Sequence, residues 1–132
     1  MSTPYLFTYG LLRRQANHDM SKFLHQQAQF VSEAVYKGKL YRIDHYPGAV
    51  PSDEPSDQVV GDVFRIDNAA VFQKLDEFEG IGPTYPQPHE YVRHVGPVTC
   101  TDGKKISAWI YLYNWPISEA KQIKSGNFLT AT

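Results

Sequence analysis

Phe7-Thr8-Tyr9-Gly10-Leu11-Leu12-Arg13-Arg14, near the amino terminus, is the stretch in which an apolar strand gives way to a turn. The strand is predicted over residues 5–9, and the glycine that follows permits a tight turn and the close approach of a ligand. Backbone N–H groups just beyond a strand end have no partner in the sheet and can hold a carboxylate or phosphate. The same pattern also occurs in simple turns, so the rest of the chain must supply the remainder of any site.

The composition is typical of one globular domain over residues 1–132, which can bury about two-thirds of its unfolded surface. The 13 basic and 14 acidic residues balance, so the charge indicates neither nucleic acid nor an anionic membrane as a partner. Cys100 is the only cysteine, and the first residues lack the features of a secretion signal. No apolar run approaches the ~20 residues that cross a bilayer. We therefore expect a soluble, cytoplasmic protein.

The hydrophobic pattern predicts a mixture of strands and short helices. Helices are expected at residues 19–27 and 69–79, and strands at residues 5–9, 28–34, 35–43, 59–66, 90–99 and 105–114. Proline and glycine predict loops at residues 45–51 and 81–89, and a helical turn is expected at residues 118–121. Both faces of the strand 105–114 are apolar or aromatic, so both must be covered. These elements predict an α+β fold, a small mixed β-barrel of six or seven strands with two or more flanking helices.

Glu79 is the carboxylate that the helical pattern singles out. At about 100° per residue it falls on the apolar face formed by Phe72, Leu75 and Phe78, whereas Glu77 points away. Partial desolvation would raise the pKa of Glu79, as a general acid/base requires. At the last turn of a helix, however, the side chain can also reach water and serve no chemical purpose. Spacing alone leaves both interpretations open.

Other polar residues carry less information. The five histidines (His18, His25, His45, His89 and His94) form no compact pair with metal-ligand spacing, so we expect no metal. Arg13 and Arg14 lack the glycine-rich motif of a phosphate-binding loop and are interpreted as a solvated pair. Tyr91 and Tyr113 can either project hydroxyls into a cavity or lie in the core with their hydroxyls satisfied. His45 can border such a cavity.

Several short sequence blocks, spread in a fixed order over nearly the whole chain, resemble the motifs of a known family. They are FTYGLLRR at residues 7–14 followed by Asn17-His18, Leu40-Tyr41, HYPGAV at residues 45–50, GDVFRI at residues 61–66, LDEFEG at residues 75–80, YVR at residues 91–93, AWIY at residues 108–111 and SGN at residues 125–127. Together they resemble the gamma-glutamylcyclotransferase-like superfamily, especially its small bacterial members, and are similar to gamma-glutamylaminecyclotransferase. The resemblance implies a small mixed barrel with flanking helices and a cavity at one end.

The resemblance also implies site residues and a reaction. Glu79 would be the catalytic acid/base, and the substrate would be bound by Tyr91 and by the main chain of Tyr9, Gly10, Leu11 and Leu12. The implied substrate is a small γ-glutamyl amide or amine, which closes to 5-oxoproline and releases a free amine without a metal or cofactor. From the balanced charge and the lack of a long apolar run, we expect neither nucleic acid nor a membrane as a partner.

Two features leave the substrate open. Many family members carry serine or threonine where this chain has Leu11, so a hydroxyl is missing from the pocket rim. The loop at residues 81–89, with three prolines, would shape the leaving-group side. A non-catalytic module that binds an amino-acid-like ligand on the same fold is the alternative function. A role as a protein-interaction partner has no support beyond the aromatic content, and the oligomeric state is not indicated.

Overall fold

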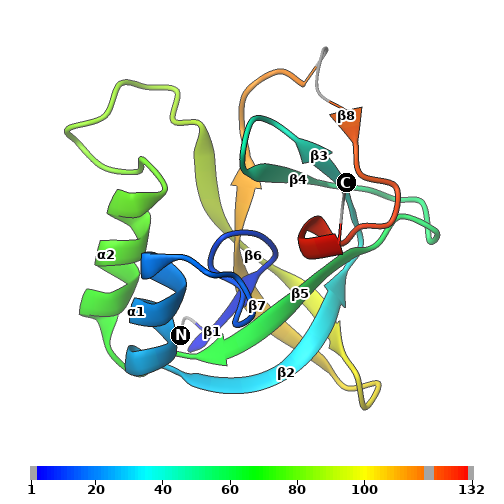
Figure 1. The fold of residues 1–132 in the computed structure, drawn as a ribbon, viewed down its shortest axis with the longest axis horizontal. Coiled ribbons are helices and arrows are strands. Elements are labelled where there is room, and N and C mark those ends of the chain that lie inside the picture. The colour runs from blue at the N-terminus through cyan, green and yellow to red at the C-terminus, as the bar shows by residue number, and fades with distance from the viewer. Residues whose placement is uncertain (1–2, 118–120, 131–132) are drawn as a thin grey trace.

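Five strands form a closed barrel in the computed structural model, which describes residues 3–117 and 121–130. In spatial order they are β1 (Tyr5–Thr8), β5 (Val59–Arg65), β2 (Gln29–Tyr36), β6 (Tyr91–Cys100) and β7 (Lys105–Tyr113). Strands β1 and β7 run parallel and close the barrel, and the other neighbours are antiparallel. The predicted small mixed barrel is therefore confirmed (Figure 1). Three further strands form a second sheet instead of entering the barrel.

The second sheet has the order β4 (Pro47–Pro51), β3 (Gly38–Arg42) and β8 (Lys121–Gln122). The loop predicted over residues 45–51 is therefore wrong, because its second part pairs with β3 and places Ala49 opposite Leu40. The strand tolerates a proline at each end because β4 is an edge strand. The two-residue strand β8 was not indicated by the sequence. Residues 118–120 of the expected helical turn lie outside the described residues, and Lys121 belongs to β8.

The two predicted helices are confirmed as α1 (Asp19–Gln27) and α2 (Ala69–Phe78), and a short 3-10 helix, η1 (Phe128–Thr130), lies near the carboxyl end. Figure 1 shows α1 and α2 on one side of the barrel, away from the second sheet. The helices touch where the Lys74 ammonium lies 4.6 Å from the centre of the Phe23 ring. Within the described ranges, no helix is long and apolar enough to cross a membrane.

Apolar side chains cover both faces of the barrel sheet, as the alternation along residues 105–114 predicts. One buried cluster contains Ala108, Ile110 and Leu112 of β7, together with Leu40 and Ala49 of the second sheet. The other combines residues of the opposite face, Trp109, Tyr111 and Tyr113, with Leu24 and Leu75 of the helices. The barrel is thus held between the helices and the second sheet, and both layers contribute to the cavity described next.

Candidate active site

A cavity of about 420 Å³ is lined by the loop after β1, the carboxyl end of α2, the β3–β4 turn and the start of β6. This volume is within the range of small-molecule sites. In Figure 1 the loop after β1 leads to the start of α1, beside the end of α2. The lining includes all six residues that the resemblance singles out, namely Tyr9, Gly10, Leu11, Leu12, Glu79 and Tyr91. The fold therefore brings three separate segments of the chain to one cavity.

The loop after β1 contains a turn in which the N–H of Arg13 donates to the carbonyl of Gly10 at 3.0 Å. The N–H groups of Gly10, Leu11 and Leu12 donate to no acceptor among the described residues. Leu12 is buried in the cluster beneath the helices, while Leu11 is half-buried at the cavity. Unpaired N–H groups beside a cavity are suited to bind an anionic group.

Gly10 is required by packing against the second sheet. A Cβ atom at this position would lie 2.6 Å from Cγ and 2.8 Å from Cδ of Pro47 in β4. Its φ is outside the left-handed region, so its backbone conformation alone does not demand glycine. The sequence suggested that this glycine gives room to a ligand, whereas the structure shows that the room on this side is occupied by Pro47.

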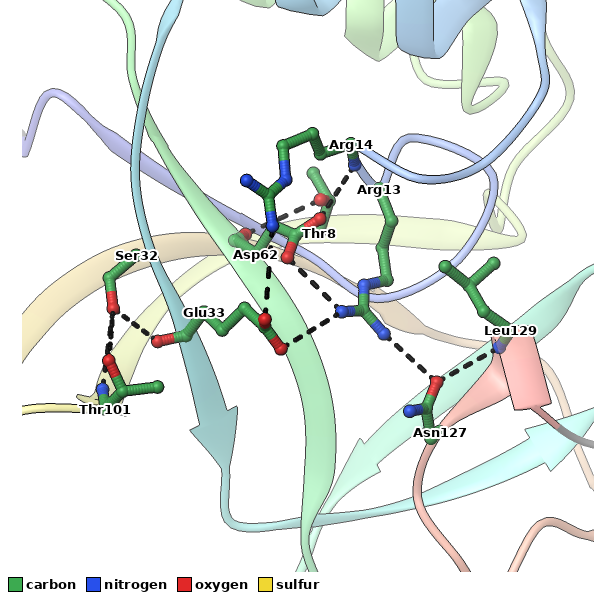
Figure 2. A network of polar contacts seen from close by, with 9 residues as sticks. All are labelled: Thr8, Arg13, Arg14, Ser32, Glu33, Asp62, Thr101, Asn127 and Leu129. Atoms are coloured by element: carbon green, nitrogen blue, oxygen red, sulfur yellow. Dashed lines mark hydrogen bonds and ion pairs between the residues drawn. The ribbon is translucent and has the colours of Figure 1, made fainter.

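Arg13 anchors the end of this loop to the body of the protein (Figure 2). It is 2% exposed, and its guanidinium donates to Oδ1 of Asp62 at 3.3 Å and to Oδ1 of Asn127 at 3.0 Å. The backbone N–H of Arg14 donates to the other carboxylate oxygen of Asp62 at 2.7 Å. The interpretation of Arg13 and Arg14 as a solvated pair is therefore wrong for Arg13, because its partners come from distant strands and segments. The Arg14 side chain is partly exposed and lies over the Phe30 ring.

Glu79 is the residue that caps the carboxyl end of α2, and its N–H donates to the carbonyl of Leu75 at 2.9 Å. Its side chain is half-buried and lines the cavity, whereas Glu77 is exposed. Burial raises the pKa of Glu79 from 4.5 to about 8, and the negative charges of Glu90 and Asp76 contribute to the same shift. Of the two interpretations left open by spacing, the desolvated carboxyl is the one that matches this geometry.

Phe78 departs from the predicted apolar face. It is 38% exposed and lines the cavity, with its ring centre 5.4 Å from that of His18. Because α2 ends at Phe78, this side chain extends past the part of the helix that packs on the barrel. The last turn of α2 therefore contributes both an aromatic ring and a carboxyl group to the cavity.

The hydroxyl groups of two cavity tyrosines are bonded within the protein. Tyr9 donates to the carbonyl of Tyr111 and accepts from the N–H of Ala49 at 3.2 Å. Tyr91 donates to the carbonyl of Pro47 at 2.5 Å. Burial raises the pKa of both phenols. They remain neutral donors that tie the second sheet to the barrel, so their hydroxyl protons are engaged in structural hydrogen bonds.

Glu90 and Tyr46 are cavity residues that the sequence did not single out. The hydroxyl of Tyr46 donates to Oε2 of Glu90 at 2.6 Å, although the two residues are 44 positions apart. Burial and the Glu90 carboxylate raise the pKa of Tyr46. No local pattern indicates this pair, because it forms only when the β3–β4 turn meets the start of β6.

Asp76 supports the end of α2 from the barrel side. Its carboxylate accepts two hydrogen bonds from Arg93 in β6, at 2.8 and 3.1 Å, and one from the Tyr111 hydroxyl at 2.7 Å. This ion pair joins two of the blocks noted in the sequence, LDEFEG and YVR. The contact fixes the position of the turn that carries Glu79.

The histidines offer no metal site in the described part of the chain. His18 and His45 line the cavity, and His18 Nδ1 also accepts from the N–H of Met20 at 3.0 Å to cap α1. Within residues 3–117 and 121–130, no three His, Cys, Asp or Glu side chains are grouped so that they could hold a metal ion.

Comparison with known proteins shows to which proteins this chain is related. The family described as "Gamma-glutamyl cyclotransferase, AIG2-like" matches residues 6–130. The chain belongs to this family. Within it, the "Gamma-glutamylcyclotransferase family protein YtfP" of Escherichia coli strain K12 is 36% identical over 127 residues, which are 94% of this chain and 95% of the relative. The resemblance inferred from the ordered blocks is therefore confirmed.

Solved structures show the same gamma-glutamyl cyclotransferase fold. The solution NMR structure of ytfP from Escherichia coli has a TM-score of 0.63 at 32% identity and covers 96% of both chains. The crystal structure of YkqA from Bacillus subtilis has a TM-score of 0.70 at 27% identity, but this chain spans only 40% of its length. An AIG2-like protein from Mus musculus shares the fold with a TM-score of 0.70 at 18% identity, over 100% of this chain and 86% of the mouse chain.

Proposed function

We propose that this member of the gamma-glutamyl cyclotransferase family is an enzyme that converts a γ-glutamyl amide or amine to 5-oxoproline and a free amine. The observation that carries the proposal is that Glu79, with a pKa of about 8, lines the same cavity as the unpaired N–H groups after β1. The name of the Escherichia coli relative supports the reaction class.

Substrate binding in this proposal uses the main chain of the loop after β1. The α-carboxylate of the glutamyl group is held by the N–H groups of Gly10, Leu11 and Leu12, which have no acceptor among the described residues. This contact orients the glutamyl chain so that its α-amino nitrogen approaches its own γ-carbonyl carbon. Main-chain recognition does not depend on the side chain at position 11, so Leu11 is compatible with it.

Proton transfer is the role of Glu79. Its pKa of about 8 is much nearer to that of the substrate ammonium than an ordinary glutamate's is, so proton transfer from the ammonium to the carboxylate is less unfavourable. The freed nitrogen then forms a C–N bond to the γ-carbonyl carbon. Protonated Glu79 gives this proton to the departing nitrogen, and the original amide bond breaks. The attacking nitrogen then passes its second proton to the Glu79 carboxylate, which leaves the neutral lactam. Glu79 transfers that proton to the released amine, which departs as an ammonium ion. The atoms and electrons of this reaction balance without water, a metal or a redox partner.

Glu79→Gln is the variant that tests this proposal. Release of 5-oxoproline is measured over a panel of γ-glutamyl amides and amines, and we expect kcat to fall about 100-fold or more because the amide cannot exchange protons. Glu77→Gln is the matched control, since it makes the same change to an exposed residue in the same turn.

Two results would contradict the proposal. Equal turnover by the wild-type protein and Glu79→Gln would remove Glu79 from the reaction. Stabilisation of the fold by amino-acid-like ligands, with no product from any compound in the panel, would instead favour the alternative of a binding module.

A further inference from the structure

The tyrosine and tryptophan side chains that line the cavity direct their polar hydrogens away from a ligand. Besides Tyr9 and Tyr91, the Tyr111 hydroxyl donates to Asp76, the Tyr85 hydroxyl to the carbonyl of Glu77 at 3.0 Å, and the Trp115 indole N–H to the carbonyl of Pro88 at 2.9 Å. These side chains therefore present mainly their rings. The carboxyl groups that remain in the lining belong to Glu79 and Glu90.

Glu90 lines the cavity, and one of its two carboxylate oxygens has a hydrogen-bond partner in the described part of the chain. The Tyr46 hydroxyl donates to Oε2, while Oε1 accepts from no residue in the described part of the chain. The backbone of Glu90 is fixed as well, because its carbonyl accepts from the N–H of Asn114 at 2.7 Å. An unpaired carboxylate oxygen in the cavity lining can accept a hydrogen bond from a cationic group of a ligand, and such charge-assisted hydrogen bonds are the stronger ones.

The rest of the lining agrees with a cationic partner. Among the residues that the structure describes, no lysine or arginine lines the cavity. Tyr85 and Trp115, which are 37% and 42% exposed, add aromatic rings at its wall. Aromatic faces attract cations as well as apolar groups, whereas a carboxylate would meet the negative charge of Glu90.

We infer that Glu90, positioned by Tyr46, selects leaving amines that carry a positive charge and disfavours those that carry a carboxylate. The inference rests on the proposed function, because it assigns the second half of the same cavity to the departing amine. Glu79 serves the proton transfers at the glutamyl end, and Glu90 binds a distal ammonium group of the amine. Glu90 is thus a specificity residue that contacts substrate.

Three γ-glutamyl conjugates of similar length test the inference, with diaminobutane, pentylamine and aminopentanoate as the amines. They share the glutamyl group and differ only in a distal ammonium, methyl or carboxylate group. For the wild-type protein we expect kcat/KM to be about tenfold higher for the ammonium conjugate than for the methyl conjugate, and lowest for the carboxylate conjugate. In Glu90→Gln, kcat/KM for the ammonium conjugate is expected to fall to about the value for the methyl conjugate, because the substitution removes the charge and keeps the shape of the side chain.

Asp44→Asn is the control for a general effect of surface charge. The Asp44 side chain is 75% exposed, close in sequence to Tyr46, and outside the cavity lining. We expect this variant to retain the wild-type ratio. Equal kcat/KM for the three conjugates in the wild-type protein, or an unchanged preference in Glu90→Gln, would overturn the inference and leave the proposed function standing.

Binding measurements separate the inference from the proposed function. If the wild-type protein releases 5-oxoproline from none of the conjugates, the proposed function fails. Calorimetric titration of the same conjugates into Glu79→Gln, and into the double variant Glu79→Gln/Glu90→Gln, then decides the charge preference alone. A cation site at Glu90 is supported if the double variant binds the ammonium conjugate more weakly than Glu79→Gln does and binds the other two conjugates equally well. If both variants bind the ammonium conjugate with the same affinity, the inference is refuted.

Discussion

At the scale of single residues, Glu79 carries a charge that the fold disfavours. The unfolded chain releases its proton near pH 4.5, whereas the folded protein keeps it until about pH 8. Between these values the folded state binds more protons than the unfolded state, so the free energy of unfolding decreases as pH rises. A group with this property lowers stability at the pH where it would act as a base, as is common at active sites.

The first prediction follows from this sign. Because glutamine cannot ionise, Glu79→Gln should become more stable relative to the wild-type protein as pH rises from about 5.5 to 8.5, by at most about 1.4 kcal/mol per pH unit. Urea denaturation at several pH values measures the difference. Glu77→Gln, at an exposed position, should follow the wild-type pH dependence. Parallel curves for Glu79→Gln and wild type would show that the Glu79 carboxyl is not desolvated.

At the scale of elements, the loop after β1 is held in place by hydrogen bonds of Arg13 and Arg14, at the carboxyl end of its turn. Asp62 in β5 is 1% exposed and accepts from both the Arg13 guanidinium and the Arg14 backbone N–H. Asn127 provides a second acceptor for Arg13, as Figure 2 shows. The turn is thus fastened at its carboxyl end to the barrel and to the segment before η1, while the N–H groups of residues 10–12 have no acceptor within the described ranges.

Arg13 and Arg14 form a matched pair for a second prediction. We expect Arg13→Ala to lower the free energy of unfolding by about 3–5 kcal/mol, since the buried Asp62 carboxylate loses its cationic partner. Arg14→Ala keeps the backbone hydrogen bond and removes a partly exposed side chain, so a loss of about 1 kcal/mol or less is expected. Chemical denaturation of both variants compares the two values, and similar losses would argue against Arg13 as the anchor.

At the scale of the whole molecule, the carboxyl-terminal segment links the barrel to the second sheet. The N–H of Ile123 donates to the carbonyl of Leu40 in β3, and the N–H of Val60 in β5 donates to the carbonyl of Gly126, both at 2.7 Å. Gly126 has a φ of 72° and lies against the backbone of Gln58. The segment can approach this closely only because no side chain separates the two backbones.

Two glycines with positive φ provide the third prediction. A Cβ at Gly126 would lie 1.7 Å from the carbonyl oxygen of Gln58, whereas a Cβ at Gly103 in the β6–β7 turn meets nothing within 4 Å. Gly103→Ala should therefore lower the free energy of unfolding only by the cost of a positive φ for alanine, about 1–2 kcal/mol. Gly126→Ala adds a clash with the backbone and should lower the free energy of unfolding by more than about 3 kcal/mol. The midpoints of urea unfolding measure both, and equal losses would mean that the terminal segment is not clamped to β5.

Local patterns in the chain were enough to predict most elements and the residues proposed for the site. Helical periodicity located both helices, and the ordered blocks located Glu79 and the loop after β1, because these signals depend on neighbours in sequence. The strand β4 was missed, since its prolines suggest a loop, and they are tolerated only because the strand lies at the edge of the second sheet.

The amino-acid sequence by itself thus determined the mixed α+β class, the family and the stretch that begins the cavity. Tertiary structure alone decided that Arg13 is buried against Asp62, that Gly10 packs on Pro47, and that Tyr46 holds Glu90 beside Glu79. Each of these contacts joins residues more than ten positions apart, so no local pattern can indicate it. Burial and charge at the cavity are properties of the folded chain, and they give the Glu79 carboxyl its raised pKa.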